Sequence, residues 1–395
     1  MNYNFATRIG GLKPSAIREI LKVTQDPSVI SFAAGNPAPD AFPVREMKEI
    51  ADELFENRAA YALQYGVSEG YTPLREQTAA RLRDKYGIGT PDDDLIIVSG
   101  GQQAMDLTAK CFLNEGDSII VEDPSFIGSL NCFRSYGVNL IGVPMQADGI
   151  DVEALEQALK ANRNVRLMYL IPTFQNPTGR VMSLEKRRRC LELARRYGVP
   201  IIEDNPYYEL RYSGEYVPTL KSLDTDGLVI YAGSYSKVLA PGIRLGFVCA
   251  NREVISRLVV VKQVSDVHTN LFFQMIASEY LARYSIDEHI AQVCDIYRAK
   301  RDAMARALRE YCADTLRFEA PEGGLFLWCD VLSGRDGAEL CRIAGARGVA
   351  AVPGAAFAID PAEKLPSIRL NFSLPTFEQL DRGIRILGEA ARELG

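Results

Sequence analysis

The most informative stretch of the chain reads Ser234-Tyr235-Ser236-Lys237-Val238-Leu239-Ala240-Pro241-Gly242-Ile243-Arg244. It lies between two apolar runs, Leu228–Ala232 and Leu245–Ala250, which are typical of buried strands. A lysine between buried strands is partly desolvated, which lowers its pKa and makes its amine nucleophilic. Lysines beside serine and glycine also occur on solvated surface turns, so the interpretation depends on whether matching residues occur elsewhere.

The residue types in this stretch could bind one cofactor at both of its ends. A lysine amine can form an imine with an aldehyde, and hydroxyls with an arginine can hold a phosphate dianion. Pyridoxal 5'-phosphate (PLP) carries both groups. We therefore predict that Lys237 bonds PLP covalently, while Ser234, Ser236 and Arg244 hold its phosphate.

Composition places the chain among ordinary globular proteins. It has 395 residues, of which 47% are hydrophobic and 24% charged, and this length predicts more than one domain. The formal charge of −6 gives no reason to expect nucleic-acid binding. The basic run Lys186–Arg189 is typical of a solvated helix face.

Several further classes of protein do not fit the sequence. No apolar run reaches the length of a membrane span, and the N-terminus does not resemble a secretory signal. The eight cysteines form no Cys-x-x-Cys motif, so reduced thiols and a cytoplasmic location are expected. The chain has only two histidines and no metal-ligand spacing, so we expect neither a metal site nor a histidine-based triad.

Short apolar runs alternate with helix-length segments between residues 95 and 250. This alternation predicts an α/β fold whose large domain holds a mostly parallel seven-stranded sheet, covered by helices on both faces. The expected strands are Leu95–Val98, Ser118–Val121, Asn139–Val143, Arg166–Leu170, Pro200–Glu203, Leu228–Ala232 and Leu245–Ala250. Ligands bind at the carboxyl ends of such strands.

The remaining segments predict a second, smaller α+β domain. The pattern is helical from about residue 252 to 312 and then mixes helices with short strands at Leu325–Cys329 and Ile368–Phe372. We expect an N-terminal arm over residues 1–45, with a helix at Pro14–Leu21, a large domain over 46–285 and a small domain over 286–395.

Candidate cofactor contacts follow the first two strands. Ser99-Gly100-Gly101-Gln102 opens a helix, where glycines and free backbone N–H groups suit a phosphate, although many strand-helix turns carry glycines. Phe126 follows the next strand and could stack on a pyridine ring, with core packing a near-equal alternative.

Three polar side chains follow the later strands. Asp204 can pair with a protonated pyridine nitrogen, and Asn176 and Tyr207 can reach the phenolic oxygen of the same ring. Each has a plain alternative: a capping aspartate, an Asn-Pro-Thr-Gly turn and a half-buried structural tyrosine.

One further arginine is unusual because it lies on an apolar strand. Arg369, between Ile368 and Leu370, requires a partner if it is buried, and its guanidinium matches a substrate carboxylate. An internal acidic partner is the alternative. Arg18 and Tyr65 are weaker candidates, because an exposed side chain is the ordinary expectation for each.

Taken together, these motifs resemble the fold-type I PLP-dependent aminotransferases, and the resemblance covers nearly the whole chain. It is similar to the subgroup of 2-aminoadipate and kynurenine aminotransferases, which includes the aminotransferase half of MocR-type regulators. The most specific matches are Gln175–Gly179, Glu203–Tyr207, Gly233–Arg244 and Glu322–Trp328.

The resemblance implies roles for individual residues. Lys237 would be the Schiff-base lysine, Asp204 the pyridine-nitrogen partner, and Asn176 and Tyr207 the phenolic-oxygen partners. The phosphate contacts would come from Gly101, Gln102, Ser234, Ser236 and Arg244, joined by Tyr65 from the neighbouring subunit of a homodimer. The substrate contacts would come from Gly35, Asn176 and Arg369, and from Arg18 for a side-chain carboxylate.

The implied reaction moves an amino group between an acidic or aromatic L-amino acid and a 2-oxo acid such as 2-oxoglutarate. The sequence departs from the family's pattern in three places. Phe126 stands where many members have tyrosine, Gly101 stands where members often have serine, and Ala34–Pro37 replaces a more glycine-rich loop. The alternatives are a PLP-dependent β-lyase or decarboxylase and a MocR-like regulator. The regulator would need a DNA-binding domain before the PLP region, and we expect none because that region begins within the first forty residues.

Overall fold

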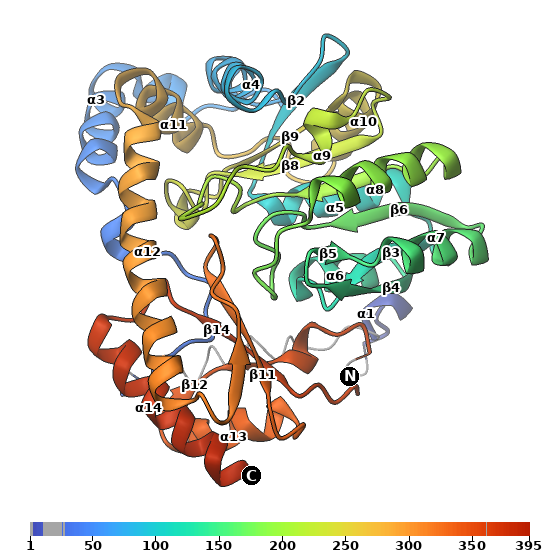
Figure 1. Ribbon diagram of the computed structural model, residues 1–395. Coiled ribbons are helices and arrows are strands. Elements are labelled where there is room, and N and C mark those ends of the chain that lie inside the picture. The colour runs from blue at the N-terminus through green and yellow to red at the C-terminus, as the bar shows by residue number, and fades with distance from the viewer. Residues whose placement is uncertain (1–2, 11–25, 27, 361) are drawn as a thin grey trace.

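The computed structural model describes residues 3–10, 26, 28–360 and 362–395. Its largest element is an eight-stranded sheet in the order β2-β9-β8-β7-β6-β3-β4-β5 (Figure 1). The strands are β2 (Asp93–Val98), β3 (Ser118–Asp123), β4 (Asn139–Gln146), β5 (Gly149–Ile150), β6 (Val165–Leu170), β7 (Ile201–Asp204), β8 (Val229–Ser234) and β9 (Gly246–Asn251). All seven predicted strands form, and β5 is an additional two-residue strand at the edge.

The sheet is mostly parallel, as predicted. The strands β4, β3, β6, β7 and β8 run parallel to one another, while β9 is antiparallel to both β8 and β2, and β5 is antiparallel to β4. The parallel strands therefore end at one common edge of the sheet, and the predicted site residues follow those ends.

Helices cover both faces of this sheet, which confirms the predicted α/β architecture. Alternate residues of a strand point to opposite faces, so Ile202 packs into one apolar cluster and Ile201 into another. The first cluster is covered by α5 (Gly101–Phe112), α6 (Ile127–Arg134) and α10 (Arg252–Gln263). The second is covered by α7 (Val152–Ala161), α8 (Leu184–Tyr197) and α9 (Leu220–Leu223).

Local sequence signals define both ends of α8. Ser183 caps the helix, since its side chain accepts a hydrogen bond from the backbone N–H of Lys186. Gly198 ends the helix with a φ of 65°, a left-handed conformation that favours glycine. A further group of helices, α3 (Val44–Ala62), α4 (Thr72–Tyr86) and α11 (Leu271–Arg283), packs together beside β2.

The C-terminal part forms a separate four-stranded sheet in the order β10-β11-β14-β13. These strands are β10 (Leu316–Phe318), β11 (Phe326–Val331), β13 (Val352–Pro353) and β14 (Ser367–Asn371), and helices α13 (Gly337–Ala346) and α14 (Phe377–Leu394) accompany them. Near the N-terminus, α1 (Thr7–Gly10) precedes β1 (Ile30–Ser31), which pairs with β12 (Val349–Ala350). Short 3-10 helices occur at Pro39–Ala41, Pro241–Ile243 and Gly354–Phe357.

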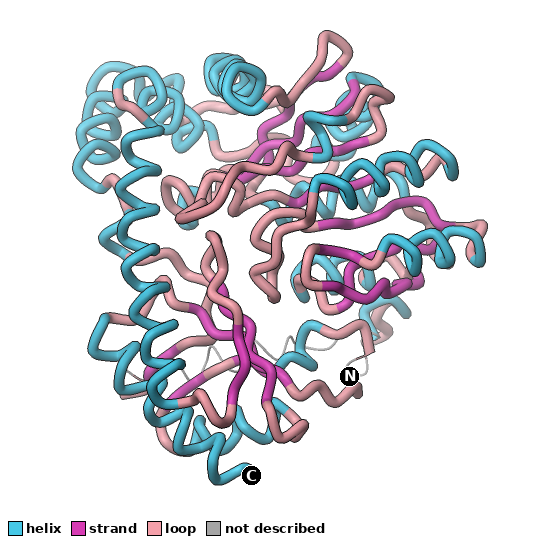
Figure 2. The backbone as a smooth tube through the Cα atoms, in the orientation of Figure 1, coloured by secondary structure: helices cyan, strands magenta, loops and turns pink. Residues whose placement is uncertain are grey.

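The long helix α12 (Ile286–Tyr311) links the two parts, running from the group around α11 to α14 (Figure 1). Loops occupy much of the region between the large and the four-stranded sheet (Figure 2). The proposed domain bounds at residues 45 and 285 stay a prediction, and the helix expected at residues 14–21 lies outside the described residues.

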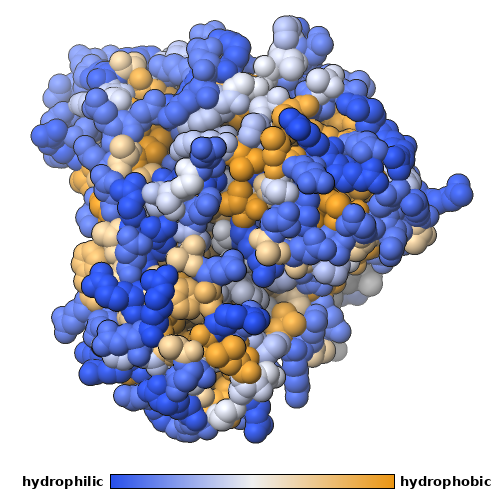
Figure 3. All heavy atoms as spheres, viewed as in Figure 1, coloured by the Kyte–Doolittle hydropathy of each residue, from blue (hydrophilic) through white to orange (hydrophobic). Residues whose placement is uncertain are grey.

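The surface is mixed in character. In the view of Figure 3, hydrophobic side chains occur in small groups between hydrophilic ones. Among the described residues, no helix combines the length and the apolar character that a membrane span requires.

Candidate active site

A cavity of about 350 Å³ lies at the carboxyl ends of the parallel strands. Among the described residues, it brings together every residue that the sequence singled out for the site except Tyr65. The predicted residues that line it are Gly35, Gly101, Gln102, Phe126, Asn176, Asp204, Tyr207, Ser234, Ser236, Lys237, Arg244 and Arg369. These residues are far apart in the sequence, so their meeting is a property of the fold.

Lys237 lies on the loop after β8 and extends into the cavity. Its Nζ donates a hydrogen bond to the carbonyl oxygen of Gly35 at 2.8 Å. Burial lowers the pKa of the Lys237 amine to about 8, and the positive charges of Arg244 and Arg369 act in the same direction. About a tenth of the amine is therefore uncharged, and thus nucleophilic, at pH 7, far more than for an ordinary lysine.

Asp204 is the last residue of β7 and is buried against the base of the cavity. The hydroxyl of Tyr169, on the neighbouring strand β6, donates a hydrogen bond to Asp204 Oδ2 at 2.7 Å. Burial raises the pKa of the Asp204 carboxyl to about 6, and the Tyr169 hydrogen bond opposes this rise. A cation placed beside Asp204 would favour the ionised carboxylate further.

Arg369, on β14, is buried but has no acidic partner among the described residues. Its Nη1 donates to Asn176 Oδ1 at 2.9 Å and its Nη2 to the carbonyl oxygen of Ala33 at 2.6 Å, while Nε has no partner in the part of the chain that the structure describes. The guanidinium carbon lies 4.2 Å from the ring centre of Phe326 and 4.6 Å from that of Phe357. The acidic partner considered as an alternative is therefore not what holds this arginine.

The other end of the cavity is built from backbone and hydroxyl groups. Gly100 has a φ of 79°, and a Cβ added there would lie 2.6 Å from Arg244 Nη2, so this position requires glycine. Arg244 Nη2 in turn donates to the carbonyl oxygen of Ser99 at 3.3 Å. A Cβ on Gly101 would meet nothing closer than 4.0 Å, so the position has room for a Cβ without displacing a neighbour.

These groups fit PLP in chemistry and placement. An amine of lowered pKa, a buried carboxylate and an arginine beside a helix N-terminus line one cavity. They correspond to the aldehyde, the pyridine nitrogen and the phosphate of the cofactor.

One predicted site residue that the structure describes, Tyr65, does not line the cavity. Tyr65 is 80% exposed, and its ring packs edge-on against His268 at a centroid distance of 5.8 Å. Arg18 lies outside the described residues. The role of each stays a prediction.

The sequence reasoning missed Tyr169 and Phe357. A tyrosine inside the apolar strand β6 looks like a core residue, although its strand neighbours β7, which ends in Asp204. Phe357 lies on a short 3-10 helix, which no periodic pattern in the sequence predicts.

Comparison with known proteins agrees with this geometry. The family model described as aminotransferase class I and II matches residues 27–387. Aromatic-amino-acid aminotransferase 1 of Thermococcus litoralis is 42% identical over 393 residues, covering 98% of this chain and 94% of its own. The 2-aminoadipate transaminase of Thermus thermophilus is 38% identical and covers 99% of this chain and 97% of its own.

Solved structures give the same result. Kynurenine aminotransferase of Pyrococcus horikoshii, in complex with PMP, superposes with a TM-score of 0.94 at 38% identity, covering 99% of this chain and 97% of its own. The Thermus thermophilus α-aminoadipate aminotransferase LysN, complexed with N-(5'-phosphopyridoxyl)-L-leucine, gives 0.90 at 37% identity, with coverages of 99% and 97%. The chain therefore belongs to the class I and II aminotransferases, in the 2-aminoadipate and kynurenine aminotransferase-like subgroup, and is a PLP-dependent transaminase of amino acids.

Proposed function

We propose that Lys237, Asp204 and Arg369 form the centre of the transaminase site and that the remaining cavity residues position cofactor and substrate around them. The observation that supports this most directly is the presence of all three side chains in one cavity. When bound, PLP supplies an aldehyde that accepts the amino group and a ring that accepts electron density from the substrate.

Each residue then has a defined task. The Lys237 amine attaches the cofactor and, once released, takes a proton from the substrate α-carbon. Asp204, held by Tyr169, keeps a proton on the pyridine nitrogen by its negative charge. Asn176 and Tyr207 donate to the phenolic oxygen, and Phe126 stacks on the ring.

The substrate carboxylate is assigned to Arg369. Its Nε hydrogen has no partner among the described residues, and Gly35 and Asn176 lie beside it in the cavity. The other described cations of the cavity, Lys237 and Arg244, are assigned to the cofactor. A second carboxylate on the substrate would therefore depend on Arg18.

We further propose an acidic or aromatic L-amino acid as amino donor and 2-oxoglutarate as acceptor. The names of the relatives, which act on aromatic amino acids, 2-aminoadipate or kynurenine, support this range. Purified protein incubated with a panel of amino acids plus 2-oxoglutarate should form glutamate. The Arg18→Ala variant should lose activity toward acidic donors more than toward aromatic ones, and equal losses would remove Arg18 from substrate selection.

The attachment site has its own test. Borohydride reduction of the purified protein followed by peptide mapping should place the cofactor on Lys237, and Lys237→Ala should abolish turnover. Lys160→Ala, which changes an exposed lysine on α7, serves as control. Formation of an unsaturated or decarboxylated product in place of glutamate would instead assign a lyase or decarboxylase activity to the site.

Shared sites in a homodimer form the next part of the proposal. Tyr65 is flanked in the sequence by the exposed side chains of Leu63 and Val67, and its ring packs against His268, which follows the exposed Val267. Exposed apolar side chains of this kind suit a surface that a second copy covers. Tyr65 would then reach the phosphate bound by the neighbouring subunit.

Mixed dimers test this arrangement. In a dimer of one Lys237→Ala and one Tyr65→Ala subunit, one site receives Lys237 and Tyr65 from different chains and should be intact. Activity should therefore exceed that of either variant alone. Failure to recover activity on mixing, with mixed dimers detected by mass, would place Tyr65 outside the neighbouring site.

A cytoplasmic location and the absence of nucleic-acid and membrane partners remain predictions. The eight cysteines, all with free thiols in the structure, are in keeping with a reducing compartment.

A further inference from the structure

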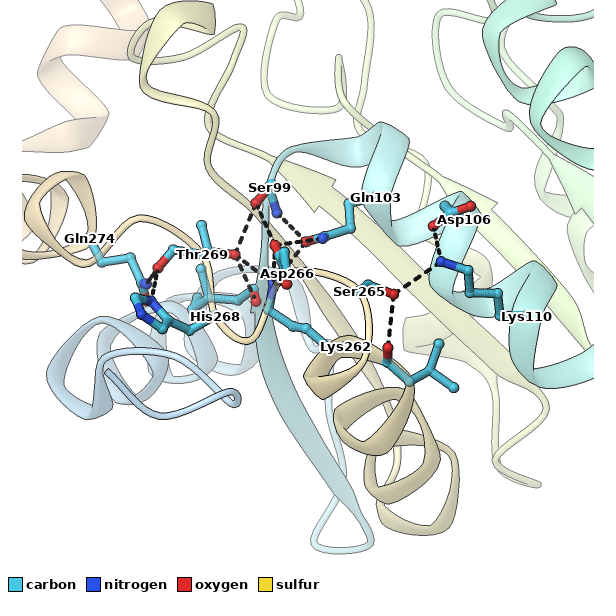
Figure 4. Close-up of polar contacts among 12 residues, drawn as sticks. Ser99, Gln103, Asp106, Lys110, Lys262, Ser265, Asp266, His268, Thr269 and Gln274 are labelled. Carbon is cyan, nitrogen blue, oxygen red and sulfur yellow. Dashed lines mark hydrogen bonds and ion pairs between the residues drawn. The ribbon is translucent and has the colours of Figure 1, made fainter. Parts of the chain in front are cut away.

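A polar cluster includes Ser99, next to the proposed phosphate-binding turn (Figure 4), and its members are not among the residues that line the cavity. Its centre is Lys262, on the last turn of α10, whose side chain is fully buried. The Lys262 ammonium contacts both carboxylate oxygens of Asp266 at 2.8 and 2.9 Å, and Gln103 Oε1 and Thr269 Oγ1 at 2.9 Å each. These four side chains come from α10, the loop after it and α5.

The cluster holds Ser99, the residue that opens the proposed phosphate-binding turn. Gln103 Oε1 accepts a hydrogen bond from the Ser99 backbone N–H at 2.7 Å, and Asp266 Oδ2 accepts from the Ser99 hydroxyl at 3.2 Å. Gln103 Nε2 also donates to Asp266 Oδ2 at 2.7 Å, so the amide bridges the carboxylate and the turn. On its other side, the Ser99 carbonyl oxygen accepts from Arg244 Nη2 at 3.3 Å. Ser99 is thus fixed from both sides.

The loop that carries Asp266 is itself tightly folded back on α10. The backbone N–H groups of Ser265, Asp266 and Val267 all donate to the carbonyl oxygen of Lys262, at 3.0, 3.0 and 3.2 Å. Val267 has a φ of 64°, a conformation that is rare for a β-branched residue and persists only where surrounding contacts enforce it. The Lys262 ammonium, which pairs with Asp266 and Thr269, supplies such contacts.

We propose that Lys262, acting through Asp266 and Gln103, is a positioning residue for the cofactor phosphate. It fixes Ser99, and with it the backbone N–H groups of the turn at Gly100 and Gly101 and the guanidinium of Arg244. The inference rests on the proposed phosphate site. It adds an ion pair between the buried Lys262 and the solvent-accessible Asp266 that is assigned no contact with cofactor or substrate.

A merely structural role for the same cluster makes a different prediction. If Lys262 only anchors the loop, its loss would weaken the fold and affect every ligand of the cavity equally. If it positions the phosphate turn, its loss would weaken ligands that carry a phosphate and spare those that do not. PLP and pyridoxal differ in this one group, so a comparison of the two separates the roles.

The experiment titrates cofactor-free protein with PLP and with pyridoxal and follows absorbance. In Lys262→Met we expect the dissociation constant of PLP to rise about tenfold or more, because the Asp266 carboxylate loses its cationic partner and releases the turn. That of pyridoxal should change by less than about twofold. Gln103→Leu, which removes the bridge without leaving a charge unpaired, should show the same selectivity with a rise of about threefold.

Two further variants complete the test. Lys110 contacts Asp106 at 2.9 Å and Ser265 at 3.0 Å (Figure 4). Ser265 is on the same loop as Asp266, but neither contact involves Ser99. The Lys110→Met variant should therefore bind PLP like the wild type. Arg244→Ala should weaken PLP selectively, since it removes a proposed phosphate contact.

The outcomes are separable. Wild-type PLP binding in the folded Lys262 and Gln103 variants, or equal losses of PLP and pyridoxal, would overturn the inference. If Lys262→Met does not fold, as judged by thermal denaturation, the Gln103→Leu result decides. Unchanged PLP binding in Arg244→Ala would show that the proposed phosphate site itself is misplaced, and the inference would fall with it.

Discussion

Tyr169 and Asp204 are joined by a hydrogen bond in the interior of the protein, with the hydroxyl donating to Oδ2 at 2.7 Å. The two residues lie on adjacent parallel strands, β6 and β7, so the register of the sheet sets their distance. Burial alone would favour a protonated Asp204, and the hydroxyl donor favours the carboxylate. Tyr169 therefore supports the negative charge that the proposed pairing of Asp204 with the pyridine nitrogen requires.

The Tyr169→Phe variant should fold normally but transaminate more slowly. Removing the donor raises the pKa of Asp204 above its present value of about 6 and weakens its support of the protonated ring. A lost hydrogen bond to a charged group is worth about 1.5–3 kcal/mol, so kcat should fall by about tenfold or more. Steady-state kinetics over a range of pH measure this, and the acidic limb of the profile should move to higher pH.

Tyr136→Phe is a matched control for this prediction. The Tyr136 hydroxyl also donates to an aspartate, Asp106, but between α5 and α6 and away from the cavity. The Tyr136→Phe variant should leave kcat unchanged. A Tyr169→Phe enzyme as fast as the wild type would mean that Asp204 does not need the hydroxyl.

The sequence predicted the large sheet because its strands are continuous apolar runs of four to six residues, a pattern that buried parallel strands impose. It did not predict β5, β12 or β13, which have two residues each and carry no periodic signal. The cavity residues were found because polar groups at strand ends stand out against such runs. Tyr169 was missed because its ring is indistinguishable from a core side chain, and only the strand register places its hydroxyl beside Asp204.

Glu122 has no role in the proposed reaction, and it allows the effect of burial on a carboxyl pKa to be tested separately. It is the fifth residue of β3 and fully buried, and its Oε2 accepts from the Ile171 N–H at 3.1 Å and from Gln175 Nε2 at 3.2 Å. Burial raises the pKa of Glu122 to about 7, although these two hydrogen bonds oppose the rise. The folded protein thus holds this proton more tightly than the unfolded chain does.

Since the folded pKa exceeds the unfolded one, the stabilisation from Glu122 is complete below about pH 4.5 and is lost as the pH rises through about 7. The Glu122→Gln variant cannot titrate, so its free energy of unfolding should decline less between pH 5 and 8, by up to about 3 kcal/mol. Urea denaturation at several pH values measures this. Glu185→Gln, on the exposed side of α8, should keep the wild-type dependence, and an equally steep decline in Glu122→Gln would disprove the assignment.

Lys237 should react with aldehydes at a lower pH than an ordinary lysine. Burial, then Arg244 and Arg369, lower the pKa of its amine to about 8, so the neutral form grows as the pH rises through that value. Stopped-flow measurement of pyridoxal attachment should give a rate that rises to pH 8 and levels off above about pH 9. In Arg369→Met the loss of one positive charge should move the midpoint to higher pH, and an unmoved midpoint would contradict the charge effect.

The last prediction concerns the two rings that contact Arg369. Phe326 and Phe357 lie 4.2 and 4.6 Å from a guanidinium that has no acidic partner among the described residues, so the rings supply part of its stabilisation. Arg369→Lys would lose the planar fork that matches a carboxylate, and kcat/KM should fall about 100-fold with PLP still bound. Phe357→Leu keeps the arginine but removes one ring, and the expected loss is about three- to tenfold, mainly in KM.

A cation–π pair outside the cavity provides the control. Phe318→Leu removes the ring near the exposed Arg309, 5.7 Å from its guanidinium carbon, and should leave kcat/KM unchanged. If Phe357→Leu instead lowered kcat without raising KM, the ring would influence the reaction through something other than carboxylate binding. Retention of wild-type KM in Arg369→Lys would remove Arg369 from the substrate site, because no ammonium at that position can reproduce the bidentate contact.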